Sequence, residues 1–183
     1  MSKLINILYK IFDDHYIVKS PKTIDEPSEK MSRVLCKGNG IPDDNILVCR
    51  LDQEHNQKMK DPFPYLRGSK MRPVMGLKGM KRICDYVIFV DKDDKLYVLL
   101  VELKKGDESP QEQLNLTEPL IDFIFKRAFI LDYLHVEYVI RKIGITDEPD
   151  KRRTSYRGSI DYNEDNYVKL YSNRNFFVQR MLH

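Results

Sequence analysis

The distribution of apolar residues between positions 83 and 104 predicts two neighbouring strands. Residues 83–91 and 96–104 are apolar over most of their length and are separated by the polar pair Asp93-Asp94. A short polar turn between two such runs is typical of a β-hairpin. Both alternating faces of this hairpin are apolar, which indicates central strands that are covered on both sides. We therefore place the hairpin in the middle of a sheet.

Apolar residues at helical spacing predict helices before and after this hairpin. We expect one helix over residues 3–13 and a second, short helix over 26–37. After the hairpin, Ser109 begins a segment with the form of a capping box, with proline at the first helical position. The helix that it opens is expected to run to about Leu134 and to bend or restart at Pro119.

Further strands are predicted on both sides of the central hairpin. The run 46–51 is typical of a strand before it, and 136–142 of a strand after the long helix. Weaker strand signals occur at 167–171, and an apolar segment follows at 176–182. The order helix, strand, strand, strand, helix, strand indicates an α/β fold with a mixed β-sheet flanked by helices.

Three ionisable residues interrupt the apolar face of the hairpin at one end. If the turn centres on Asp93-Asp94, Asp85 faces Glu102 on the neighbouring strand, and Lys104 lies on the same face. Two ionised carboxylates about 5 Å apart repel each other by roughly 3 kcal/mol at an effective dielectric near 20. A divalent cation between them reverses the sign of this interaction, and oxygen ligands suit Mg²⁺ or Mn²⁺.

Lys104 adds a second chemical function to these two acids. Its amine is placed to orient a water nucleophile or to stabilise charge that develops on a phosphate. The alternative is a structural ion-pair cluster at a strand end. Direct opposition of two acids favours a catalytic site, because it destabilises a fold that holds no cation.

Positive charge is concentrated in one part of a nearly neutral chain, whose net charge is +3. Residues 52–82 form a long polar excursion that is rich in glycine and proline. Its basic residues are Lys58, Lys60, Arg67, Lys70, Arg72, Lys78, Lys81 and Arg82. Beside a site for phosphodiester chemistry, this stretch is expected either to contact nucleic acid or to form a solvated surface loop.

The composition is that of an ordinary folded domain. The chain has 183 residues, of which 42% are hydrophobic and 32% charged, enough for one domain with a real core. Its three cysteines are scattered, which fits a reducing cytoplasm. The apolar N-terminal run is broken by Tyr9 and Lys10 and lacks a cleavage site, so we interpret it as a helix and not a signal peptide. No run is long enough to span a bilayer, and we expect no membrane contact.

With Asp85, the sequence Glu102-Leu103-Lys104 and a helix after it, the chain resembles the PD-(D/E)XK nuclease superfamily. The resemblance covers roughly residues 46–142, and Cys84 stands where proline often precedes the aspartate. It implies a restriction-endonuclease-like fold with an αβββαβ core. The expected layout is a single nuclease domain over 1–183, with the core at about 46–142, the excursion at 52–82 and a C-terminal extension at 143–183.

The resemblance also implies roles for individual residues. Asp85 and Glu102 become ligands of Mg²⁺ or Mn²⁺, Leu103 contributes its backbone carbonyl, and Lys104 is the catalytic lysine. Many members have a glutamine in the next helix, which here is Gln113 or Gln111. An acid from an early segment is also common in the superfamily. The candidates for that acid are Glu29 first, then Glu26 and Glu54.

These observations predict a metal-dependent endonuclease or exonuclease that hydrolyses phosphodiester bonds in DNA or RNA. The alternative is a non-catalytic nucleic-acid-binding or scaffold subunit on the same fold. A third expectation is the effector of a defence or toxin system. A compact nuclease without a recognition domain needs control, which a regulatory protein partner or a homo-oligomer would supply.

Overall fold

The computed structural model of the chain describes most of the sequence in eight segments. These are residues 2–19, 23–26, 31–36, 40–51, 82–105, 109–147, 160–171 and 175–183. Within them, no helix has the length and apolar character needed to cross a membrane.

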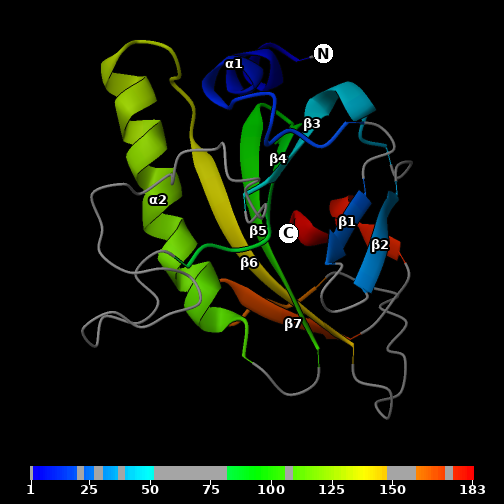
Figure 1. Cartoon of the computed structure of the whole chain (residues 1–183). Coiled ribbons are helices and arrows are strands. Elements are labelled where there is room, and N and C mark those ends of the chain that lie inside the picture. The colour runs from blue at the N-terminus through cyan, green and yellow to red at the C-terminus, as the bar shows by residue number, and fades with distance from the viewer. Residues whose placement is uncertain are drawn as a thin grey trace, which may run out of the picture.

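A five-stranded mixed sheet forms the centre of the molecule (Figure 1). Its strands are β3 (Ile46–Arg50), β4 (Tyr86–Lys92), β5 (Lys95–Lys105), β6 (Tyr138–Asp147) and β7 (Tyr167–Tyr171), adjacent in that order. Strand β4 is antiparallel to both of its neighbours, β3 and β5. Strands β5, β6 and β7 run parallel to one another. The predicted α/β class and mixed sheet are confirmed, including the weakly predicted strand at 167–171.

The hairpin of β4 and β5 has the predicted register. Lys92 pairs with Lys95 and Tyr86 with Val101. The turn residues Asp93 and Asp94 have φ angles of 53° and 58°. Positive φ at both central residues is the pattern of a type I′ turn, whose twist matches that of the strands. This turn fixes the register, and the register decides which side chains share a face.

Two helices cover one face of this sheet (Figure 1). Helix α1 (Lys3–Ile11) packs on β3 and β4, and Ser2 caps it by accepting a 3.0 Å hydrogen bond from the Ile5 amide. Helix α2 (Gln111–Ile130) packs on β5 and β6. It runs without interruption through Pro119, so the expected restart does not occur, and it ends before Leu134.

The start of α2 follows the predicted capping box only in part. The amide of Gln111 donates a long, 3.4 Å hydrogen bond to Ser109 Oγ, and Pro110 already has helical backbone angles. Glu112, however, pairs with Arg82 at 3.0 Å. The helix is therefore tied to the chain segment that enters β4.

A smaller sheet covers the opposite face. Its strands are β1 (Thr23–Glu26), β2 (Met31–Cys36) and β8 (Asn175–Phe177), followed by the 3₁₀ helix η3 (Val178–Met181). A second 3₁₀ helix, η2 (Asp43–Asn45), precedes β3. The predicted helix at 26–37 is wrong, because β2 is paired with β1 on one side and with β8 on the other. Strand pairing with a segment about 140 residues away overrides a local helical pattern of two turns.

Each face of the central sheet has its own hydrophobic core. On the helix side, Leu8, Leu100 and Phe125 belong to one buried cluster. On the other side, Ile88 and Met181 belong to a second cluster. The central strands are thus covered on both faces, as their apolar pattern predicts.

Candidate active site

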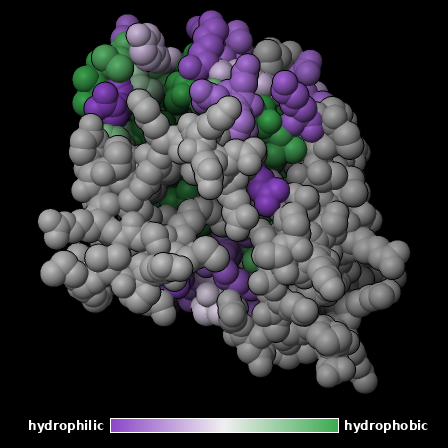
Figure 2. Space-filling model, in the orientation of Figure 1, coloured by the Kyte–Doolittle hydropathy of each residue, from purple (hydrophilic) through white to green (hydrophobic). Residues whose placement is uncertain are grey.

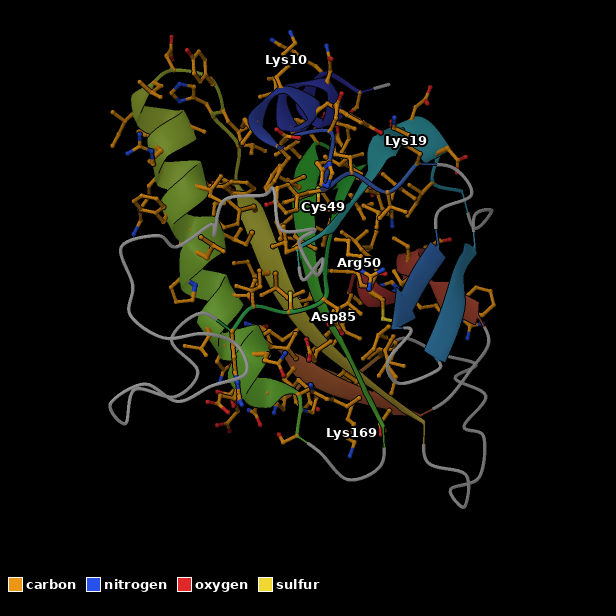
Figure 3. The ribbon with its side chains drawn as sticks, viewed as in Figure 1. Lys10, Lys19, Cys49, Arg50, Asp85 and Lys169 are labelled. Carbon is orange, nitrogen blue, oxygen red and sulfur yellow. The ribbon has the colours of Figure 1, made fainter. Side chains whose placement is uncertain are left out.

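Asp85 and Glu102 meet where the chain enters β4, in the middle of the molecule (Figure 3). The Asp85 amide donates a 3.1 Å hydrogen bond to Glu102 Oε2, and the Leu103 amide donates a 2.7 Å bond to Asp85 Oδ2. The two residues are 3% and 0% exposed. The structure therefore buries two carboxyl groups together on adjacent strands, at the position that the hairpin register predicts.

Lys104 lies beside this pair. Its Nζ is 2.9 Å from Glu102 Oε1, and its side chain is 19% exposed. Oε1 is buried and accepts no well-formed hydrogen bond from the residues that the structure describes, so this contact is an ion pair only. One ammonium group thus lies beside a pair of buried carboxyl groups and contacts Glu102. Buried acceptors of this kind are costly unless a further donor or a cation satisfies them.

Burial and the Asp85 carboxylate raise the pKa of Glu102 to about 8, and the Lys104 ammonium group opposes this shift. Burial is the larger cause because the carboxylate loses its hydration. In the metal-free protein at neutral pH, Glu102 therefore retains a proton for much of the time. A cation bound at this place would favour the ionised form and release that proton.

The start of α2 fixes the backbone that leads into Asp85. Thr117 Oγ1 accepts a 2.7 Å hydrogen bond from the Cys84 amide and donates a 2.8 Å bond to the Gln113 carbonyl. Gln113 Nε2 donates a weaker, 3.4 Å bond to the Ile83 carbonyl. Gln113 thus lies next to the entry of β4 and contacts its backbone. Its predicted catalytic role stays a prediction.

Replacing Thr117 with valine should destabilise the protein by about 1–3 kcal/mol, because the buried Cys84 amide loses its acceptor. For a chain of this size, the melting temperature should fall by roughly 3–10 °C. Thr117→Ser, which keeps the hydroxyl group, should lose much less. Thermal denaturation of both variants checks this, and equal losses would show that the hydroxyl group does not stabilise the segment.

Gly144 allows α2 to approach the sheet beside Glu102. It is the partner of Glu102 on β6. A Cβ atom at this position would lie 2.3 Å from Pro110 Cγ and 2.9 Å from the Tyr167 hydroxyl oxygen. Only glycine fits so close an approach. The first turn of α2 is therefore held over the row of paired residues that contains Glu102.

An apolar cleft of about 300 Å³ lies next to Asp85, between α1 and α2. The helices contribute Ile11 and Leu120 to it, and the sheet side contributes Leu51 and Ile83. The Leu51 amide donates a 3.0 Å bond to the Asp85 carbonyl, and Ile83 precedes Asp85 by two residues. The cleft is therefore a recess beside the acids, on the helix side of the sheet.

Cys49 and Cys84, the two buried cysteines near this site, are not nucleophiles. Burial raises the pKa of Cys49 to about 12 and that of Cys84 still further. Both thiols are free and protonated at neutral pH. The reactive groups at this place are the two carboxyl groups and the Lys104 amine.

Several predicted site residues lie outside the described segments. They are Glu29, its alternative Glu54 and the basic residues Lys58, Lys60, Arg67, Lys70, Arg72, Lys78 and Lys81. The backbone of Glu26 is in β1. Gln111 Nε2 donates a 3.2 Å hydrogen bond to Asp165 Oδ2. In the described segments, no three His, Cys, Asp or Glu side chains form a group suited to a metal ion.

Two residues that shape the site were not predicted from the sequence. Thr117 is a hydroxyl residue on the buried face of α2, and Gly144 is the one glycine of strand β6. A strand glycine is a sign of close backbone approach, so Gly144 could have been found. The partner of Thr117 depends on tertiary packing and gives no local signal.

The chain was compared with models of protein families, with curated proteins and with solved structures. None of the three comparisons finds a match.

Proposed function

We propose that the chain is a metal-dependent nuclease of the PD-(D/E)XK type that hydrolyses phosphodiester bonds in DNA or RNA. One observation carries the proposal. Glu102 Oε1 is buried without a hydrogen bond, beside Asp85 and at 2.9 Å from Lys104 Nζ. Two acids and a lysine at the end of a central hairpin are the groups that this chemistry uses.

The arrangement of the elements supports a restriction-endonuclease-like fold. Helix α1 is followed by β3, β4 and β5, then by α2 and β6, with β1 and β2 inserted before β3. Without that insertion, this is the αβββαβ order that the resemblance implies. Asp85 directly precedes β4 and Glu102 lies in β5, which supports the comparison with the superfamily motif.

The residues fit a divalent cation. Asp85 and Glu102 supply hard oxygen ligands. When both are ionised, their two negative charges exceed the single positive charge of Lys104 by one. The Leu103 carbonyl is the further ligand that the resemblance implies. When bound, Mg²⁺ or Mn²⁺ neutralises these charges and polarises a phosphate oxygen. Glu102 Oε1, which is buried and contacts the Lys104 ammonium group, is the atom whose environment such a cation would complete.

The side chains of the protein supply the remaining functions. Hydrogen bonding from the Leu103 amide holds the Asp85 carboxylate in one orientation. Lys104 is held against Glu102, and its amine is partly exposed, so it can orient an attacking water molecule or stabilise charge on the phosphate. Both functions depend on placement, which the hairpin register and the docked first turn of α2 provide.

A cleavage assay tests the proposal. Supercoiled plasmid, single-stranded DNA and RNA are incubated with the protein and millimolar Mg²⁺ or Mn²⁺, with chelator as the blank. We expect metal-dependent cleavage of at least one substrate. Cleavage that persists in both Glu102→Ala and Lys104→Ala would remove these residues from the mechanism.

One observation favours the scaffold alternative. Each carboxyl group accepts a backbone hydrogen bond from the neighbouring strand segment, and Lys104 pairs with Glu102, so the three residues also hold the strand ends together. A scaffold needs no cation. Calorimetry that detects no binding of divalent ions at millimolar concentration would favour this alternative.

Cation binding should depend on pH because Glu102 must ionise. Its pKa is about 8 in the folded protein against an ordinary value of 4.5. Between these two pH values Glu102 is protonated in the folded state and ionised in the unfolded state. The free energy of unfolding of the metal-free protein therefore falls as pH rises from 4.5 to about 8. Binding releases the proton, and the affinity for Mn²⁺ should fall about tenfold per pH unit below that pKa.

Melting temperatures with and without Mn²⁺ measure this dependence. The increase in melting temperature on adding the cation should be large near pH 8 and much smaller near pH 6. Over these two pH units the affinity for Mn²⁺ should fall about a hundredfold. Glu102→Gln should abolish the difference. Equal stabilisation of the parent protein at both pH values would contradict the proposed ligand role of Glu102.

A further inference from the structure

Large apolar side chains are exposed together at the end of α2. We call this group the α2-end patch: Phe123, Phe129, Ile130, Leu131 and Tyr133. Ile130 is 79% exposed and Tyr133 63%. Figure 2 shows hydrophobic atoms gathered over this end of the helix. Single exposed apolar residues are common, but a contiguous group of this size marks an interaction surface.

These side chains do not pack on the sheet: Phe129 contacts the His135 ring at 4.7 Å between centroids, and Arg127 lies over the Phe123 ring. Helix α2 packs on the sheet through Ile121, Phe125 and Ala128, and the α2-end patch lies outside that buried stripe. The chain turns away from the helix at Asp132, whose φ is 61°. Leu131 and Tyr133 are therefore presented to solvent on either side of a sharp turn, next to the last helical residues.

An apolar cleft adjoins the α2-end patch. It has a volume of about 280 Å³, and Leu134, Val136 and Tyr138 contribute to its wall. Phe129 and Ile130 belong both to the cleft and to the patch. The surface thus offers projecting apolar side chains beside a recess of similar chemistry. In a two-fold dimer, projections of one copy meet the recess of the other, and the same contact occurs twice.

The charges around the α2-end patch are of both signs. Lys126 and Arg127 are basic, whereas Asp122, Asp132 and Glu137 are acidic. Three acids disfavour an anionic membrane surface, which attracts basic rims. A mixed rim is complementary to a second copy of itself, because the basic residues of one copy can face the acids of the other.

We propose that the chain forms a two-fold homodimer through the α2-end patch. Five large side chains that each lose roughly 100 Å² would bury about 500 Å² per copy, or about 1,000 Å² in total. That area is near the lower limit for a specific interface, so the dimer should dissociate in the micromolar range. The proposal does not depend on the proposed function.

The position of the α2-end patch keeps the candidate active site free. Asp85 is tied to the first turns of α2 through Cys84 and Thr117, whereas four of the five patch residues lie in the last turn of the helix or just after it. A helix of 20 residues is about 30 Å long. A dimer formed through the residues in and after the last turn of α2 therefore does not cover the segment that carries the acids.

Sedimentation equilibrium of the full chain tests the proposal. At tens of micromolar protein, the mass should approach twice the 21.7 kDa of one chain. Ile130→Asp and Phe129→Asp should weaken association at least tenfold. The matched control is Leu116→Asp, because Leu116 is an exposed apolar residue of the same helix outside the patch. It should dimerise like the parent protein, and circular dichroism checks that each variant is folded.

Three results would overturn the proposal. The first is a parent protein that stays monomeric at about 100 µM, well above a micromolar dissociation constant. The second is a folded Ile130→Asp variant that dimerises normally. The third is a monomer that binds phosphatidylcholine vesicles through Ile130 and Phe129, which would assign the patch to a lipid surface. Cleavage activity is a separate measurement, so failure here leaves the proposed function intact.

Discussion

Replacing Glu102 with glutamine should abolish metal-dependent cleavage and at the same time stabilise the metal-free protein. Activity should fall by roughly 1,000-fold or more, because the cation loses a charged ligand. Stability should rise because the raised pKa shows that the buried carboxylate is destabilised by burial and by Asp85. Near pH 8.5, where most of the parent carboxylate is ionised, the melting temperature of the metal-free protein should rise by several degrees.

The opposite signs of these two effects make the Glu102 test specific. A residue with only a structural role would lose stability and activity together. Glu137→Gln is the matched control, because Glu137 is exposed and lies before β6, outside the candidate site. It should change neither quantity. If Glu102→Gln lowers the melting temperature of the metal-free protein, the carboxylate stabilises the fold and the interpretation of its burial is wrong.

Replacing Lys104 with methionine should separate catalysis from cation binding. Cleavage should fall by about 100- to 1,000-fold, because the transition state loses a positive charge. Affinity for Mn²⁺ should not fall when measured near pH 9, since the lysine competes with the cation for Glu102. At lower pH, binding weakens because removal of the lysine raises the pKa of Glu102 further.

Lys95→Met is the control for this variant. Lys95 begins β5, at the opposite end of the strand that carries Lys104. It should retain full cleavage, and Lys104→Arg should retain part of it because the charge is kept. A Lys104→Met protein that cleaves at the parent rate would show that the ion pair with Glu102 is structural. Calorimetry and single-turnover cleavage measure the two quantities independently.

The central hairpin could be predicted from the sequence because its signals are local. The Asp93-Asp94 turn sets the register, and alternation then places Asp85 and Glu102 on one face. The structure supports each of these steps. It adds the hydrogen bond from the Leu103 amide to Asp85, which depends on a side-chain rotation that no pattern encodes.

The parts that could not be predicted depend on contacts between distant segments. Residues 31–36 form a strand because β1 and β8 pair with them, and the latter lies near the C-terminus. Thr117 supports Asp85 only because α2 docks on the segment before β4. Neither contact leaves a periodic signal in the chain. The predictions for Glu29 and the basic stretch lie outside the described segments and stay predictions.

A crystal structure of the protein soaked in Mn²⁺ tests the central claim most directly. The anomalous signal of manganese locates the ion without reference to activity. The account predicts a peak between the carboxyl groups of Asp85 and Glu102, with Lys104 beside it. Ordered crystals in saturating Mn²⁺ that show no peak there, with Glu102 still bound only to Lys104 and the Asp85 amide, would contradict it.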